Sequence, residues 1–381
     1  MIEYWVWLST RSNVGARTSV ALLEAFGNPE EVYRANREQL LASGCITHNM
    51  LPSLLDKSLL ETNRILADCT DKQIRILTLH EDGYPASLRV IADPPLILYL
   101  RGELPETEER PVIGIVGARS ASTYGLSVAE RMGYQLHAGG CTIVSGMAKG
   151  VDGAAMRGAL KAGNRVIAVL GCGVDTIYPR ENKDIYNELL TRGCIVSEYP
   201  PQTPPVPENF PPRNRIISGL SDGVLVVEAP KKSGSLITAE DALEQNRDIF
   251  AIPGNIGVPA CEGSNRLIRN GAELVQDGSD ILQAYAYRYE LTPDQASSDS
   301  RPEKTIDTDK PIVYIDAQVI PQGLSAECAA VMKAVGASTL TMDEVISASG
   351  LSAGKVLSAV TLLEVKGYLQ RLAGNRFRRL K

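Results

Sequence analysis

Basic and hydroxyl side chains recur where buried β-strands are expected to end. The segment GIVGARSASTYG, residues 114–125, runs from an apolar stretch through a glycine into a helix-like pattern. A dinucleotide-binding loop would read G-x-G-x-x-G, with a carboxylate about 20 residues further on. Arg119, Ser120 and Ser122 stand here instead. An arginine with hydroxyls after a strand indicates an anionic ligand that is held by more than backbone N–H groups.

Five later segments repeat this arrangement after apolar runs. Each supplies cations, amides or hydroxyls where a helix is expected to begin, and helix N-termini favour phosphate. One phosphate needs only a few such groups, so the larger set predicts a chain of phosphates, each of which an arginine can grip bidentately. Phe210 and Tyr178 add rings on which the bases of a single strand could stack. The candidate ligand residues are Lys149, Arg180, Phe210, Arg213, Asn214, Arg215, Lys231, Ser233, Gly234, Ser235 and Asn265.

Single segments have simpler explanations. Arg213 and Arg215 could pair with Asp222 or Glu228. Asp152 could satisfy backbone donors at a helix start. The three histidines form no evident nucleophile–base pair, and the seven scattered cysteines contain no CxxC pair, so the sequence indicates neither a metal site nor a cofactor. The phosphate interpretation therefore depends on the whole set.

The spacing of the apolar runs predicts the scaffold that positions these residues. Six runs begin at residues 112, 141, 165, 194, 223 and 248, which is typical of βαβ units. Runs this continuously apolar suit strands that are buried on both faces of a parallel sheet. We predict an α/β, Rossmann-like, doubly wound and mainly parallel sheet over residues 71–285. Its ligands would bind beyond the carboxyl ends of the strands.

Other patterns flank this region. Residues 1–70 contain short helical patterns that end on glycine, which predicts a helical domain. Residues 286–320 are polar and predict a flexible linker. Residues 321–381 predict two helices around Gly350 and two short strands about a turn at residues 374–375, the layout of a winged helix. Six basic residues and no acidic one occur from Lys366 onward.

Composition limits the class of protein. A chain of 381 residues allows two or three domains, and 44% hydrophobic with 22% charged residues is ordinary for a globular protein. The net charge of −6 argues mildly against a nucleic-acid-coated protein, although averages conceal patches. Scattered cysteines suit reduced thiols, and neither a signal peptide nor a membrane-length apolar run is evident. We expect a cytoplasmic protein without membrane contact.

Seven motifs, in one order from residue 116 to residue 275, resemble the DNA-processing protein A family (DprA, also called Smf). They are VGARSASTYG, SGMAKGVDGAA, AVLGCGVDTIYPRENK, SEYPPQTPP, FPPRNRIISGLS, VVEAPKKSGSLITAEDALEQNRDIFAIPG and EGSNRLIRNGAELV. The N-terminal segment LSTRSNVGARTSVALLEAFG is similar to the SAM-like or helix-hairpin-helix start of longer members. The C-terminal segment looks like their winged-helix domain.

The resemblance implies a bacterial cytoplasmic protein that binds and protects incoming single-stranded DNA. It implies that the protein loads the recombinase RecA onto this DNA and displaces single-strand binding protein during natural transformation. It also implies a homodimer formed through the Rossmann-like domain, without catalysis or a cofactor. Carried over by motif, the DNA pocket would use Arg119, Arg180 and the arginines of PPRNR, with Lys149 and the KSGS loop as further candidates.

This sequence departs from the family pattern at three places. Met156 stands where a histidine is often found, which weakens a catalytic interpretation more than a DNA-binding one. Gln202 replaces the glycine of PPGT. Asn13 replaces the first glycine of the N-terminal hairpin motif, so we expect a structural role for that domain.

Two other hypotheses remain open. The chain could be a nucleoside-monophosphate phosphoribohydrolase-like enzyme, a class with a P-G-G-x-G-T-x-x-E loop whose glutamate acts on the ribosyl bond. The corresponding loop, KSGSLITAE, lacks the double glycine and places Glu240 two residues after Thr238. Alternatively, the winged helix could read duplex sequence, but its second helix offers only Lys355, Ser358 and Thr361 for that purpose. We favour a protein-interaction or auxiliary role for it.

Overall fold

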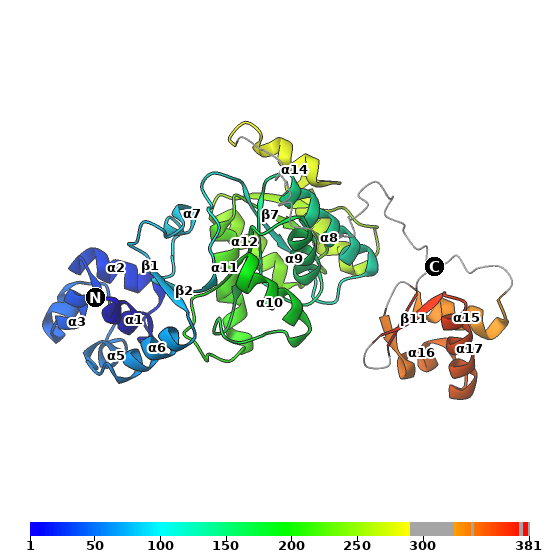
Figure 1. Cartoon of the computed structure of the whole chain (residues 1–381), viewed down its shortest axis with the longest axis horizontal. Coiled ribbons are helices and arrows are strands. Elements are labelled where there is room, and N and C mark those ends of the chain that lie inside the picture. Colours follow the sequence, from blue (N-terminus) through cyan, green and yellow to red (C-terminus); the bar gives the residue numbers. More distant parts are fainter. Residues whose placement is uncertain (290–323, 337–338, 373–375, 380–381) are drawn as a thin grey trace. The chain divides into compact units, whose positions relative to one another are not determined.

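The computed structural model describes residues 1–289, 324–336, 339–372 and 376–379. These residues form two compact units, which we describe separately. One contains the N-terminal helices and a nine-stranded sheet, and the other a three-stranded sheet with its helices (Figure 1). The boundaries at residues 70, 285 and 320 stay predictions, and residues 290–320 of the expected linker lie outside the described residues.

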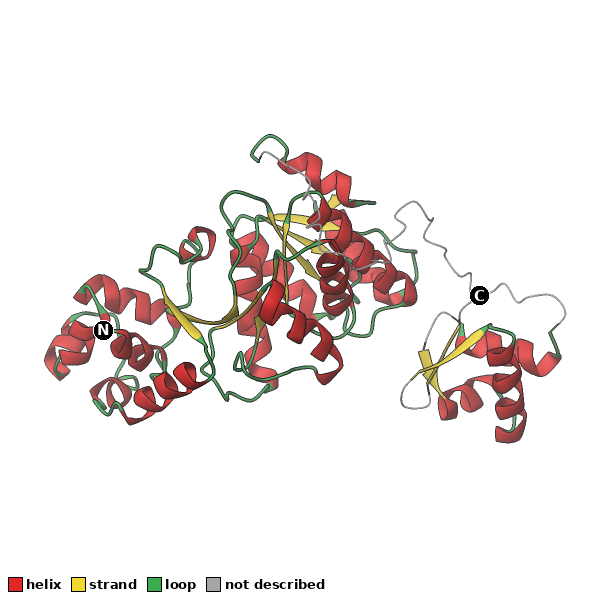
Figure 2. Ribbon diagram, in the orientation of Figure 1, coloured by secondary structure: helices red, strands yellow, loops and turns green. Residues whose placement is uncertain are grey.

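The nine-stranded sheet has the order β1-β2-β6-β5-β4-β3-β7-β8-β9. Strands β3 to β9 are parallel to one another, whereas β2 is antiparallel to both β1 and β6. Helices cover both faces (Figure 2), which confirms the predicted doubly wound α/β fold, with the six spaced apolar runs forming β3 to β8. The strands are β1 (Arg75–Thr78), β2 (Ile97–Gly102), β3 (Val112–Val116), β4 (Thr142–Ser145), β5 (Val166–Leu170), β6 (Cys194–Ser197), β7 (Gly223–Val226), β8 (Asp248–Ala251) and β9 (Glu273–Leu274).

The winding of the sheet reverses between β3 and β7. From β3 the chain proceeds outward through β4, β5 and β6, and it returns to the other side of β3 as β7. The register pairs Val116 with Val226, so both strands end at the same level. The loops that leave β3 and β7 diverge at this point, which is the crevice where ligands of open α/β sheets bind.

The helices of this region pack on the buried strands. Helix α9 lies against β3 and β4, α11 against β3, β4 and β5, and α12 against β7 and β8. The α-helices are α8 (Thr123–Ala138), α9 (Val151–Ala162), α10 (Lys183–Arg192), α11 (Phe210–Leu220), α12 (Gly234–Glu244), α13 (Glu262–Arg269) and α14 (Gly278–Tyr285), with 3-10 turns η1 (Arg180–Asn182), η2 (Pro207–Asn209) and η3 (Pro259–Cys261).

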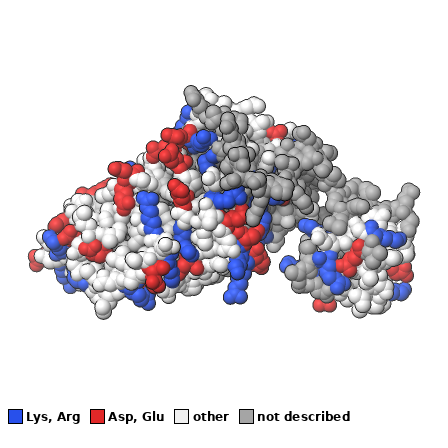
Figure 3. All heavy atoms as spheres, viewed as in Figure 1, with Lys and Arg blue, Asp and Glu red and all other residues white. Residues whose placement is uncertain are grey.

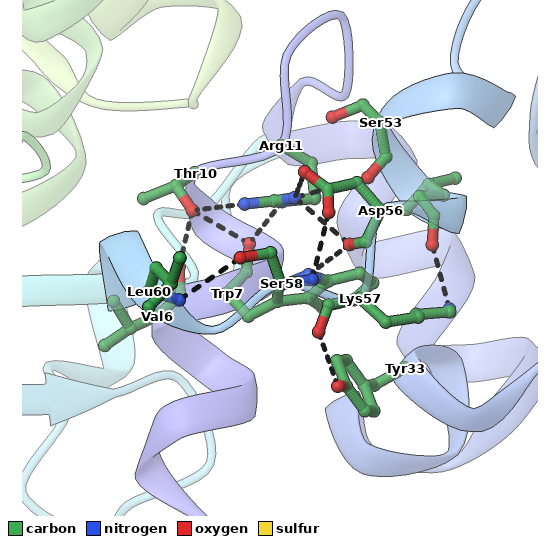
Figure 4. Close-up of polar contacts among 11 residues, drawn as sticks. Val6, Trp7, Thr10, Arg11, Tyr33, Ser53, Asp56, Lys57, Ser58 and Leu60 are labelled. Atoms are coloured by element: carbon green, nitrogen blue, oxygen red, sulfur yellow. Dashed lines mark hydrogen bonds and ion pairs between the residues drawn. The ribbon is translucent and has the colours of Figure 1, made fainter. Parts of the chain in front are cut away.

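The N-terminal region is organised around Trp7 and Arg11. The Trp7 ring is fully buried, and its indole N–H donates to the backbone carbonyl of Asp56. Arg11 is only 8% exposed, and its guanidinium donates to the carbonyls of Trp7 and Ser53 (Figure 4). Basic and acidic side chains are interspersed over the face of this region seen in Figure 3. Its helices are α1 (Ile2–Ser9), α2 (Ala16–Phe26), α3 (Pro29–Arg34), α4 (Arg37–Ala42), α5 (Leu51–Leu55) and α6 (Leu60–Asp71), and α7 (Ala86–Arg89) follows β1.

The C-terminal unit has the predicted helices and paired strands of a winged helix. Its sheet has the order β10-β12-β11, and its core includes Val331, Val360 and Phe377. The turn at residues 374–375 and Lys381 lie outside the described residues. The elements are α15 (Ala326–Val335), β10 (Thr339–Thr341), α16 (Met342–Ser349), α17 (Ala353–Val365), β11 (Leu369–Leu372) and β12 (Arg376–Arg379).

Among the described helices, none is by itself long and apolar enough to cross a membrane. The pair Met342–Ser349 and Ala353–Glu364 satisfies the length and composition of a span, with a bend of 110° between the two helices.

Candidate functional site

A hollow lies at the carboxyl ends of the strands, where the winding reverses. Its volume is about 550 Å³, and a side pocket of about 140 Å³ adjoins it. Arg119, Ala148, Tyr178 and Phe210 line both cavities, which we call together the strand-end hollow. Eight of the predicted site residues line its larger part: Ser120, Arg213, Asn214, Ser233, Gly234 and Ser235 join Arg119 and Phe210 there.

The loop after β3 presents Arg119 to solvent because its backbone is fixed on both sides. The N–H of Ala118 donates to the Glu228 carbonyl at 2.7 Å, and the Ala118 carbonyl accepts from Val151 at 3.2 Å. Gly150 has a φ of +78°, and a Cβ there would lie 2.2 Å from the Ala118 carbonyl oxygen. Only glycine therefore permits this approach of α9, which leaves the Arg119 side chain exposed at the rim.

Phe210 and Tyr178 form an aromatic wall of the hollow. Their ring centroids lie 5.5 Å apart with an interplanar angle of 37°. The guanidinium carbon of Arg119 lies 5.3 Å from the Phe210 centroid, close enough for a cation–π contact. The guanidinium carbon of Arg213 also lies near this ring, 5.8 Å from the Phe210 centroid. Tyr178 is 37% exposed and Phe210 is half-buried, so part of each ring is accessible to a base.

Arg213 forms the floor of the hollow and is 4% exposed. Its Nη1 donates to the carbonyl of Gly146 at 3.0 Å and also to that of Val169, so it joins the ends of β4 and β5. Burial lowers the pKa of the guanidinium to about 10, and the nearby Asp152 carboxylate opposes this shift. Arg213 remains cationic at neutral pH, and it fixes the strand ends on which the site is built.

Asp152 supports the loop that carries Lys149. Its buried carboxylate accepts hydrogen bonds from the N–H groups of Gly146 (3.2 Å) and Ala148 (3.4 Å), as expected in the first turn of α9. Burial raises the pKa of Asp152, against the effect of Arg213. Lys149 itself is exposed and forms an ion pair with the exposed Glu181, which is a weak contact that phosphate can replace.

The structure does not bring Arg215 into the same cavity as Arg213. PPRNR lies in the first turns of α11, whose early positions are occupied by prolines. A separation of two residues on an α-helix corresponds to a rotation of about 200° around its axis. Arg215 therefore points away from the strand-end hollow and pairs with Asp93 (3.3 Å) and Glu198 (2.7 Å).

The start of α12 completes the hollow on the β7 side. The Ser233 hydroxyl caps the helix by accepting from the Ser235 N–H at 3.3 Å, and the Asn214 side chain donates to the Gly234 carbonyl at 3.3 Å. Lys232 also lines this wall, whereas Lys231 is exposed outside it. Gly234 stands at the N-terminus of α12, and no atom lies within 4 Å of the position that a Cβ would take there. Both features suit the approach of a phosphate oxygen.

Three other predicted residues lie outside the hollow. The Asn265 amide is engaged with the backbone of Gly254, which it contacts as donor (2.9 Å) and acceptor (3.0 Å), so it anchors the loop after β8. The Ser122 hydroxyl accepts from the Gly125 N–H at the start of α8. Arg180 is exposed at the start of η1 and lines neither cavity.

The cations around the hollow differ in their availability. Across the described ranges, no carboxylate lies within ion-pair distance of Arg119, Arg180, Lys231 or Lys232. An exposed cation without a partner can bind phosphate without first losing an ion pair. Lys232 and a rim of four prolines also line the hollow, and neither is among the candidate residues predicted from the sequence. The prolines are Pro205, Pro207, Pro211 and Pro230. Pro205 and Pro207 belong to the proline-rich stretch before PPRNR, which was a signal for this part of the rim.

A second hollow, of about 1020 Å³, is lined by the N-terminal helices, by the segment that follows α7, and by α11 and α12. We call it the carboxylate hollow, because carboxylates outnumber arginines among its lining residues. The charged lining residues are Glu61, Asp93, Glu198, Asp241 and Glu244, with Arg17, Arg215 and Arg247.

The residues of the other two hypotheses are placed as follows. Glu240 is exposed on α12 and Met156 is fully buried, and neither lines the strand-end hollow. On α17, the hydroxyls of Ser358 and Thr361 donate to carbonyls of their own helix, at 3.0 and 2.9 Å. Within the described ranges, no group of three or more His, Cys, Asp or Glu residues could hold a metal ion.

Comparison with known proteins gives consistent matches over most of the chain. The family model described as DNA recombination-mediator protein A matches residues 75–286, and the DprA winged helix domain matches residues 316–375. Protein Smf of Synechocystis sp. is 32% identical over 396 residues, which covers 99% of this chain and 98% of that protein.

Solved structures of two DNA processing proteins are among those that resemble the chain. DNA processing protein A (DprA) from Streptococcus pneumoniae matches with a TM-score of 0.65 and 33% identity, over 74% of this chain and 98% of that one. DNA processing protein A from Helicobacter pylori, which was solved to study its single-stranded DNA binding mode, matches with a TM-score of 0.52 and 29% identity over 57% of this chain and 97% of that one. The motifs, the fold and these matches together show that the chain belongs to the DNA recombination-mediator protein A family (DprA/Smf).

Proposed function

We propose that the chain binds single-stranded DNA at the strand-end hollow and acts as a recombination mediator. The observation that carries this proposal is the unpaired Arg119 beside the aromatic wall of Phe210 and Tyr178. Cations follow the phosphates of a single strand, and aromatic rings stack on its bases without reading sequence. The H. pylori relative, whose single-stranded DNA binding mode has been studied, supports this assignment.

In the cell, the bound strand would be DNA taken up during natural transformation. The protein would protect this strand, displace single-strand binding protein and load RecA, in the cytoplasm and as a homodimer formed through the Rossmann-like domain. The family description as a recombination mediator supports this role. The test follows RecA-dependent ATP hydrolysis on DNA that is covered with single-strand binding protein. We expect the chain to shorten the lag before hydrolysis, and an unchanged lag would contradict mediation.

Fluorescence anisotropy with labelled oligo-dT and a matched duplex, across a salt series, tests the binding site. The wild type is expected to prefer the single strand. Arg119→Ala removes a charge-assisted contact of about 1.5–3 kcal/mol, so its Kd is expected to rise by roughly tenfold or more. The slope of log K against log salt is expected to fall by about 0.7, the contribution of one phosphate contact in a single strand.

Arg34→Ala is the matched control, because it removes the same charge from the exposed face of α3. Equal affinities of wild type and Arg119→Ala would move the site elsewhere. Mediation requires no catalysis, and we propose that the chain is not an enzyme. Release of ribose 5-phosphate from a nucleotide panel would instead support the phosphoribohydrolase-like alternative.

A further inference from the structure

Four side chains connect the N-terminal helices to the loop that carries Tyr178. Lys72 follows α6, and its Nζ lies 2.6 Å from Oδ2 of Asp175 in the β5–α10 loop. The side-chain amide of Gln202, in the loop after β6, donates to Asp68 of α6 at 2.6 Å. The backbone N–H of Gln202 donates to Oδ1 of Asp175 at 2.8 Å. We call Asp68, Lys72, Asp175 and Gln202 the latch.

The ion pair of the latch is better shielded than an ordinary surface pair. The side chain of Asp175 is 10% exposed and that of Lys72 is 32% exposed, so water and salt screen their attraction only in part. Burial alone would raise the pKa of Asp175, but hydrogen bonds from Lys72 and Gln202 hold it below its usual value. The hydrogen bond to Asp175 raises the pKa of Lys72. The pair therefore stays ionised throughout the neutral range.

The latch acts on the segment that leads to the aromatic wall. Asp175 precedes Tyr178 by three residues, and the loop between them forms no strand or helix. The same loop is also held at Val174, whose carbonyl accepts from the Tyr186 hydroxyl at 2.7 Å, and at Gly173, whose N–H donates to the Thr203 carbonyl at 3.0 Å. The latch is the only one of these three anchors that involves the N-terminal helices.

Gln202 adopts a backbone conformation that favours glycine. Its φ is +67°, which is uncommon for a residue with a Cβ. The family pattern PPGT has glycine at this position. Glutamine supplies what glycine cannot, namely a side chain that reaches Asp68. The loop of Gln202 also carries Pro205, which lines the strand-end hollow.

We propose that the latch is a positioning device through which the N-terminal helices hold the Tyr178 wall in the conformation that binds single-stranded DNA. This inference rests on the proposed function. Lys72 and Asp175 do not line the strand-end hollow, so they act through Tyr178. Loss of the latch should weaken stacking while the number of phosphate contacts stays the same.

The test uses the full chain and compares Lys72→Met with Lys161→Met. Lys161 forms an ion pair with Glu130 between α9 and α8, so its variant removes the same charge without affecting the latch. For Lys72→Met we expect a three- to tenfold higher Kd for oligo-dT, an unchanged salt slope and faster hydrogen exchange in the peptide 171–180. Lys161→Met should match the wild type in all three measurements. Lys72→Arg should bind oligo-dT more tightly than Lys72→Met does.

A double-mutant cycle with Asp175→Asn tests whether the pair acts as a unit. The double variant should bind no more weakly than the weaker of the two single variants. Both tryptophans of the chain, Trp5 and Trp7, lie in α1, so their emission shows whether the N-terminal helices remain folded in each variant. Gln202→Gly, which removes the link to Asp68 but relieves the positive φ, provides a second variant that should also bind more weakly.

Three results would overturn the latch. The first is an unchanged Kd for oligo-dT in both Lys72→Met and Gln202→Gly. The second is a reduced salt slope in Lys72→Met, which would make Lys72 a phosphate ligand. The third is an unchanged rate of hydrogen exchange in peptide 171–180 of Lys72→Met. If Arg119→Ala weakens binding while these variants do not, only the latch fails. If the wild type shows no preference for single strands, the proposed function fails first.

Discussion

The two hollows of the first unit present opposite charges to a ligand. In the carboxylate hollow, Arg215 is neutralised by Asp93 and Glu198, and further carboxylates remain. In the strand-end hollow, Arg119 has no such partner in the described residues and lies beside an aromatic ring. The larger cavity would repel a phosphate chain and the smaller one would attract it. Cavity size is therefore a poorer guide to the DNA site than the pairing of charges.

A single helix separates the two environments. Arg213 and Arg215 are two residues apart on α11, yet one lies under the strand-end hollow and the other lines the carboxylate hollow. Both are buried, at 4% and 9% exposure, and both satisfy their donors within the protein. Their guanidinium groups contact backbone carbonyls and neighbouring carboxylates, which distinguishes them from the exposed Arg119.

Among the variants that distinguish the two hollows, Phe210→Ala is expected to have the largest effect on the affinity for DNA. Stacking of one base on an aromatic ring contributes about 1–3 kcal/mol, so Kd for oligo-dT should rise roughly 5- to 150-fold. The salt slope should stay constant, because no phosphate contact is lost. Phe210→Trp keeps an aromatic face and should retain affinity. If the alanine variant binds like the wild type in an anisotropy titration, the aromatic wall is not a stacking platform.

Arg215→Ala should separate stability from binding. The variant leaves the carboxylates of Asp93 and Glu198 without their partner, which is expected to lower the free energy of unfolding by about 1–3 kcal/mol. Affinity for oligo-dT and the salt slope should not change in the folded protein. Urea unfolding and anisotropy on the same preparation measure both quantities. A loss of affinity with a reduced slope would show that Arg215 contacts the strand after all.

The smallest expected effect is on the pH dependence of folding stability, to which Asp241 of the carboxylate hollow contributes. Burial, together with Glu244 and Asp93, raises the pKa of Asp241 to about 6. Because this value exceeds that of the unfolded chain, the contribution of Asp241 to stability is present below about pH 4 and is lost as the pH rises through 6. Asp241→Asn should therefore raise the urea midpoint at pH 7.5 relative to the wild type. The difference between the two proteins should shrink toward pH 4.5, and a constant difference would contradict the raised pKa.

The sequence was sufficient to predict the sheet and the rim of the site. Continuous apolar runs at βαβ spacing correspond to β3 through β8, because strands buried on both faces have little freedom in composition. Arg119, Ser120 and the Ser233–Ser235 turn lie where the ends of these strands meet. These residues follow from local order along the chain and from the rule that ligands bind beyond the strand ends.

Features that depend on side-chain direction or on distant pairing could not be predicted in this way. PPRNR has the composition of a loop, and only its position at a helix start separates Arg213 from Arg215. Asn265 is polar and follows a strand, but its amide is occupied by Gly254. The latch joins Lys72 and Asp175 across 103 residues, a separation at which no local pattern relates the two.

Photo-crosslinking of a 5-iodouracil-substituted single strand to the full-length protein tests the central claim most directly. After digestion, mass spectrometry identifies the peptides that carry the crosslink. We predict that the major crosslinks fall on Tyr178 and Phe210, in the peptides that form the aromatic wall. Crosslinks confined to the winged-helix strands 369–372 and 376–379, or to the lining of the carboxylate hollow, would contradict the assignment of single-stranded DNA to the strand-end hollow.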